Sequence, residues 1–109
     1  MNINDAHKAV DFIIENAPKY AQAKAERIYL DEWRKSKKAM LMQESKESSA
    51  AAKEMDAYAH QDYLTVLQGI KEAVEVEESL RWKLIAAQAR IEVLRSAEAS
   101  NRHLDRATQ

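Results

Sequence analysis

The sequence predicts an all-α protein, and three observations support that prediction. The 109 residues include one Gly and one Pro, which leaves almost no turn chemistry for a β sandwich or barrel. Ala, Glu, Lys, Gln, Arg and Leu dominate the composition, as they do in long helices. Apolar residues recur at three- and four-residue steps. We therefore expect one domain over residues 1–109, in which two or three helices form an elongated antiparallel hairpin that assembles into an oligomeric helical bundle.

The first expected helix covers residues 5–16. Asn4 or Asp5 can cap its N-terminus, and Pro18 is expected to end it, because the residue before a proline avoids helical dihedral angles. Pro18 can then serve as the first residue of the next helix. The apolar face of this first helix consists of Ala6, Ala9, Val10, Ile13, Ile14 and Ala17.

The second expected helix covers residues 18–45. Leu30 and Leu41 flank its apolar side, and weak helix formers over 44–49 place the main turn there, with Ser48 or Ser49 capping the next helix. The run of alanines at 50–52 would equally allow one continuous helix, so both readings stay open. The apolar side consists of Ala21, Ala25, Ile28, Tyr29, Trp33, Ser36 and Met40.

The third expected helix, over residues 50–100, has the strongest pattern in the chain. Steps of four and three residues give five heptads in register, which favours a long C-terminal coiled-coil helix, with a frayed tail at 101–109. Forty residues of helix are roughly 60 Å long, whereas a compact chain of this length has a radius of gyration of about 13 Å. Gly69 interrupts the pattern and suggests a close helix approach or a mild bend. The heptad positions are Ala59, Tyr63, Val66, Ile70, Ala73, Glu77, Leu80, Leu84, Ala87, Ile91, Leu94 and Glu98.

Charge is divided along the chain although the formal total is only −1. Residues 19–42 carry seven basic and three acidic side chains, residues 50–78 two and seven, and residues 79–109 six and three. This division favours an antiparallel pairing of the basic second helix with the acidic first half of the third.

The second half of the third helix would then project past the hairpin and need cover. The same surface of a second copy, or the first helix of that copy, could supply it, and the sequence does not choose between them. The predicted oligomer interface of a homodimer or larger assembly consists of Val66, Ile70, Leu80, Leu84, Ala87, Ile91 and Leu94.

Two basic patches, 33–38 and 81–106, are candidates for nucleic-acid contact, because cations beside an aromatic ring can hold phosphates while the ring stacks a base. A solvated face, or a rim paired with the acidic helix, is the simpler interpretation, and Trp82 could merely cover the flank of the heptad row. The candidate contacts are Trp33, Arg34, Lys35, Lys37, Lys38, Arg81, Lys83, Arg90 and Arg95.

Catalysis is not expected from this sequence. It lacks cysteine, and its three histidines (His7, His60 and His103) form neither an HExxH motif nor a repeated Glu-x-x-His motif. We therefore predict no catalytic residue, no metal and no cofactor. No 18 apolar residues run consecutively, and the first ten residues do not resemble a signal peptide, so a soluble cytoplasmic protein is expected.

The segment LRWKLIAAQARIEVLR at 80–95, with Asn101-Arg102 and Arg106-Ala107-Thr108, resembles small helical proteins of tailed bacteriophages and prophages. The resemblance covers residues 63–108 and implies a phage protein of the early replication and recombination region, located in the cytoplasm of a bacterial host. It transfers no functional residue. We expect a non-enzymatic adaptor that binds itself and a phage or host protein, with a nucleic-acid-binding accessory protein as the alternative.

Overall fold

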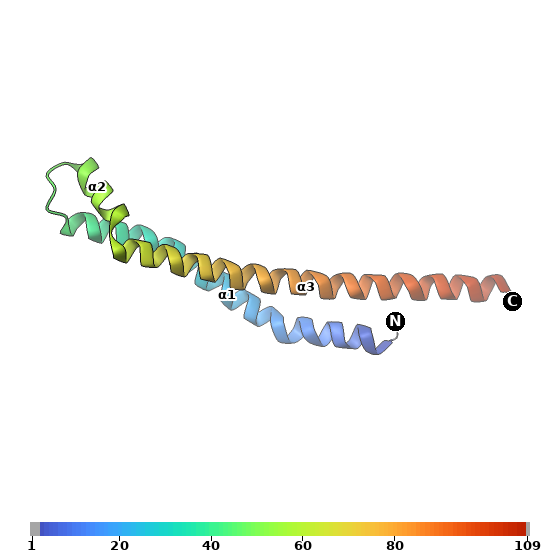
Figure 1. Ribbon diagram of the computed structural model, residues 1–109. Coiled ribbons are helices and arrows are strands. Elements are labelled where there is room, and N and C mark those ends of the chain that lie inside the picture. Colours follow the sequence, from blue (N-terminus) through green and yellow to red (C-terminus); the bar gives the residue numbers. More distant parts are fainter. Residues whose placement is uncertain (1–2, 109) are drawn as a thin grey trace. The chain divides into compact units, whose positions relative to one another are not determined.

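The computed structural model describes residues 3–108 and contains three helices (Figure 1). They are α1 (Ile3–Glu44), α2 (Ala50–Ala59) and α3 (Gln61–Thr108), and no strand occurs among the described residues. The predicted all-α class and long C-terminal helix are therefore confirmed. The chain divides into two compact units, and both are built from parts of α1 and α3. Unit 1 combines the described residues up to Tyr20 with those from Glu78 onward, and unit 2 comprises Ala21–Glu77.

Helix α1 continues through Pro18, so the expected division into helices 5–16 and 18–45 is wrong. A proline inside a helix costs about 3 kcal/mol through its lost hydrogen bond and its ring clash. Pro18 is exposed, as is Ile14, whose carbonyl loses its partner, so that side of the helix faces solvent. Packing of one uninterrupted row against α3 offsets the cost. The row, all buried or half-buried, consists of Ala6, Ala9, Ile13, Asn16, Tyr20, Ala23, Arg27, Leu30, Arg34, Lys37 and Leu41.

The apolar side predicted for residues 18–45 faces outward instead. Ile28, Tyr29 and Met40 are exposed, and Trp33 is at the limit of exposure. The prediction failed because it followed apolar side chains alone, whereas Arg27, Arg34 and Lys37 occupy the inner face of α1.

The predicted turn at 45–49 is confirmed. Ser49 has an extended backbone and its hydroxyl accepts a hydrogen bond from the amide of Ala52 at 3.0 Å, which caps α2. The single helix expected over 50–100 is divided at His60, whose ψ of 139° ends α2. His60 then starts α3, since its Nδ1 accepts from the amide of Asp62 at 3.0 Å.

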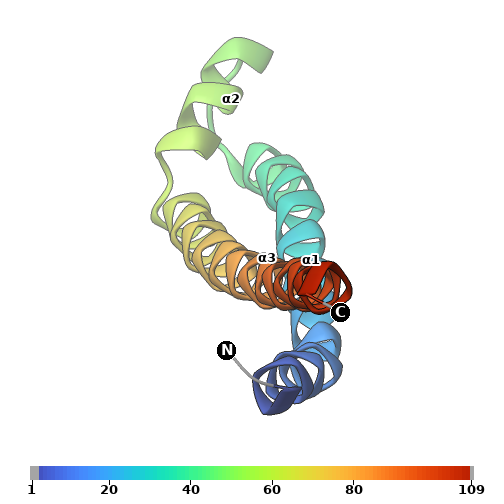
Figure 2. The same cartoon turned by 90° about the vertical axis from the view of Figure 1, so that its right-hand side faces the viewer.

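The division at His60 places α2 at the turn end of unit 2 (Figure 2). Leu41, Ala57 and Tyr63 form a small buried cluster there, against which Met42 packs. The rings of Tyr58 and Tyr63 meet edge to face with centroids 5.2 Å apart. The three helices of unit 2 therefore share one core at the turn.

The heptad row of α3 is buried or half-buried at every position from Tyr63 to Leu94. Only its predicted first and last members, Ala59 and Glu98, are exposed. The helix continues to Thr108, beyond the limit of residue 100 expected for it, and Gln109 lies outside the described residues.

Gly69 makes no close approach to α1. A Cβ atom placed on it would meet only Leu30 Cδ1, at an ordinary 3.9 Å. The glycine is therefore a weak point in a regular helix rather than a packing requirement.

Candidate interaction groove

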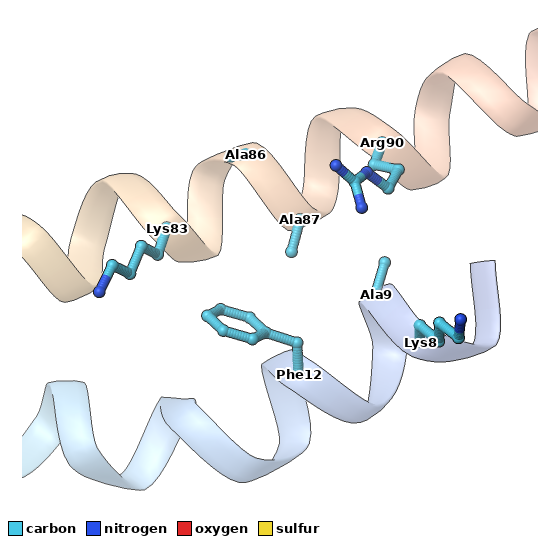
Figure 3. A pocket seen from close by; sticks show the side chains of 7 residues that line it. All are labelled: Lys8, Ala9, Phe12, Lys83, Ala86, Ala87 and Arg90. Atoms are coloured by element: carbon cyan, nitrogen blue, oxygen red, sulfur yellow. The ribbon is translucent and has the colours of Figure 1, made fainter. Parts of the chain in front are cut away.

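A groove of about 460 Å³ lies between α1 and α3 in unit 1 (Figure 3). Figure 3 shows Ala9 and Ala87 pointing toward one another, with Phe12 in the space between the two helices. Both alanines are buried, yet their side chains are too short to fill that space. The residues lining the groove are Lys8, Ala9, Phe12, Lys83, Ala86, Ala87 and Arg90.

The rim of this groove is entirely cationic. Lys8 comes from α1, and Lys83 and Arg90 come from α3, while no carboxylate lines the groove. All three cations are exposed, and none forms an ion pair with another residue between Ile3 and Thr108. The groove thus combines an apolar floor with unpaired positive charge.

The basic patch at 33–38 lies in unit 2, where acidic or phenolic groups engage each of its cations. Lys35 pairs with Glu32 at 3.3 Å within α1. Lys37 Nζ is 3.6 Å from Asp62, and Trp33 is 37% exposed. The patch therefore resembles the paired rim that the charge division predicts, more than a free phosphate-binding surface.

Arg34 and Lys38 are held by tyrosines of the turn. Arg34 Nη1 donates to the hydroxyl of Tyr63 at 3.4 Å, and this hydrogen bond is the main cause that raises the pKa of Arg34 above its ordinary value. Lys38 Nζ lies 4.5 Å from the ring centroid of Tyr58 and 3.5 Å from Glu54. The hydroxyl of Tyr58 is the main cause of the raised pKa of Lys38.

The second basic patch, 81–106, is only partly neutralised. Arg81 pairs with Glu78 at 3.4 Å and lies over the ring of Trp82, while Arg95 pairs with Glu92. The four candidate contacts of this patch therefore separate into two paired residues and two, Lys83 and Arg90, that line the groove.

One buried ion pair that was not predicted from the sequence crosses unit 2. Arg27 Nε and Nη2 donate to the two carboxylate oxygens of Glu77, the second bond being 3.1 Å long. The side chain of Glu77 is only 7% exposed. The signal was present, because Glu77 interrupts an apolar heptad row and therefore requires a cation on the opposite helix.

The predicted oligomer interface lies on the inner face of α3, within the single chain. Ala87 and Leu94 are buried, and the other five predicted residues are half-buried. The expectation that the second half of this row projects without cover is wrong, because α1 continues past Pro18 and packs along it in unit 1.

No group of three or more His, Cys, Asp or Glu between residues 3 and 108 is arranged to hold a metal ion. Over the same residues, no helix has a stretch that is long and apolar enough to cross a bilayer. Of the three histidines, His60 has a structural role, since it joins α2 to α3.

Comparison with known proteins returned no relative: no family model, no curated protein and no solved structure matches the chain.

Proposed function

We propose that this chain is a non-enzymatic interaction protein of the phage type, which associates with itself and presents helical surfaces to another protein. The observation that carries the proposal is the outer face of α1. Val10, Ile14 and Ile28 are 42%, 67% and 46% exposed. Large apolar side chains exposed on the surface of an otherwise polar protein mark candidate interaction sites.

The spacing of this exposed surface supports a helical partner. Val10, Ile14, Ala17, Ala21 and Ile28 follow steps of four, three, four and seven residues along one continuous helix. Residues at this spacing lie on one face of a helix and can pack into a second helix. We refer to these five residues as the outer row of α1.

The proposal is tested by the mass of the protein in solution across a concentration series. Ile14→Glu and Ile28→Glu place charges on the outer row and should weaken association, because an interface would bury them without a partner. Both positions are exposed, so helicity measured by circular dichroism should not change. Gln22→Glu adds the same charge at another exposed position of α1 and is the matched control. A monomer at every concentration that also captures no partner contradicts the proposal.

The nucleic-acid alternative receives less support from the geometry. The ion pairs at Lys35, Lys37 and Lys38 remove most of the free charge at 33–38. Binding through phosphates weakens steeply as salt rises. We expect no retention on single- or double-stranded DNA at low salt, and strong retention that salt abolishes would favour the alternative.

A further inference from the structure

The apolar floor and cationic rim of the unit 1 groove would suit a partner with apolar and acidic groups, and α2 presents that combination. Met55, at the centre of α2, is 74% exposed, the largest exposure among the large apolar side chains of the described residues. Glu54 and Asp56 flank it on either side. A short, flexible thioether between two carboxylates complements an apolar space rimmed by cations.

We infer that α2 of a second copy docks in the unit 1 groove, with Met55 entering the space between Ala9 and Ala87 and its flanking carboxylates meeting Lys83 and Arg90. The inference rests on the proposed self-association and adds a second contact to the one at the outer row of α1.

The size of the groove fits a side chain presented by a helix. About 460 Å³ exceeds the volume of one methionine side chain, and α2 also presents Ala51 and Ala59 one turn to either side of Met55. Helix-in-groove recognition uses anchors at this spacing. Phe12 provides an aromatic surface for the sulfur.

Charge favours the same occupant. The three rim cations have no partner among the described residues, and Asp56 likewise forms no ion pair there. Glu54 already forms an ion pair with Lys38, so Asp56 is the carboxylate of α2 that is free to pair with the rim cations of the groove. Lys8 lies within one turn of Asp5 and Asp11 on its own helix, so Lys83 and Arg90 carry most of the attraction. Opposite charges at such a rim fix the choice and orientation of the partner.

Charge exchange between the two surfaces tests the inference. Lys83→Glu/Arg90→Glu reverses the groove, and Glu54→Gln/Asp56→Lys reverses the face of α2 while leaving residue 54 able to accept from Lys38. Each variant alone should associate at least about tenfold more weakly, by sedimentation at several concentrations. An equimolar mixture of the two variants should regain association, because each groove then meets a face of opposite charge. Circular dichroism of each variant establishes that the helices persist.

Cross-linking gives an independent readout, because the chain contains no cysteine. A mixture of Met55→Cys and Ala86→Cys chains should form a disulfide-linked heterodimer under mild oxidation. The pair Met55→Cys and Ser100→Cys is the control, since Ser100 is exposed on α3 and does not line the groove.

The two proposals fail in different ways. Association that is insensitive to both charge reversals, or equal cross-linking to Ser100→Cys, overturns the docking of α2 and leaves the proposed function in place. A chain that stays monomeric at all concentrations overturns the docking and the self-association together.

Discussion

In unit 2 the inner row of α1 carries Arg27, Arg34 and Lys37, whereas in unit 1 the same row carries Ala9, Ile13 and Asn16. In unit 2 these cations interact with residues of α3: Glu77 and Asp62 form ion pairs, and the Tyr63 hydroxyl accepts a hydrogen bond. In unit 1 the row is mostly apolar and includes small side chains. The unpaired cations lie beside this row rather than within it.

This difference shows two uses of one antiparallel helix pair. Charged side chains on the inner face of a helix need partners, and those partners meet them at only one alignment of the two helices. In unit 2 these charged groups are therefore paired within the chain. Small side chains such as Ala9 leave space between the two helices, so unit 1 keeps an open groove. The paired groups of unit 2 fix its alignment, and the open groove of unit 1 is the site of the docking that we propose.

The largest expected effect comes from breaking the ion pair of unit 2. Glu77→Leu should lower the free energy of unfolding by about 3 kcal/mol, because it leaves the partly buried Arg27 without a counter-charge. Urea unfolding measures the change. The double variant Arg27→Leu/Glu77→Leu should recover most of the loss, since it leaves neither charge of this pair without the other. A double variant as unstable as Glu77→Leu alone would contradict this account.

A smaller loss is expected from truncating the apolar row of unit 1. Leu94→Ala should lower the free energy of unfolding by about 2 kcal/mol, the low end of the range for buried leucines. The loss is small because the cavity forms at the last buried position of the row. Amide hydrogen exchange should accelerate over residues 78–94 more than over 61–77 if the units open separately. Val93→Ala is the control, because Val93 is 55% exposed and lies outside the buried row of α3.

Removing the weak point in α3 should stabilise unit 2. Gly69→Ala should raise the free energy of unfolding by up to about 1 kcal/mol, since alanine has the higher helix propensity and its Cβ would meet only Leu30. A rise in melting temperature checks this, and a fall would show that the neighbours of Gly69 resist the added methyl group.

The smallest expected effect concerns Lys38 at the turn. Its pKa is raised above 10.5, mainly by the Tyr58 hydroxyl, with desolvation opposing and Glu54 adding to the shift. A raised pKa in the folded state means that the protonated form stabilises the fold below about pH 10.5 and that this contribution is lost as the pH rises further. Nuclear magnetic resonance titration of the Lys38 side chain should give a lower pKa in Tyr58→Phe than in the unchanged protein. Equal values would remove the hydroxyl as the cause.

Much of the fold could be predicted from periodicity and charge. The heptad row of α3 and the turn at 45–49 were both identified, and the pairs formed by Lys37 and Lys38 confirm the antiparallel match of basic and acidic segments. The helix boundary expected at Pro18 is wrong because the local preference of proline is outweighed by eleven inner positions that stay in register on both sides of it.

The candidate groove was beyond sequence reasoning for a different reason. Ala87, Lys83 and Arg90 were each noticed, but as members of an interface row or a basic patch. Their common role depends on Phe12 and Ala9, which lie far away in the sequence and come near only when α1 pairs with α3. Such a site cannot be found by scanning one helix at a time.

The hairpin connectivity has a kinetic consequence. Arg34 and Tyr63 are 29 residues apart in the chain, whereas Arg27 and Glu77 are 50 apart. Ala9 and Ala87, which meet across the groove of unit 1, are more distant still. Because loop closure costs more entropy as the loop lengthens, the cluster of Leu41, Ala57 and Tyr63 should form first and zippering should proceed toward the chain ends. During synthesis, most of α3 would therefore have to leave the ribosome before residues 3–20 of α1 could pack against it. Unit 1 would be the last part of the fold to form and the first to open.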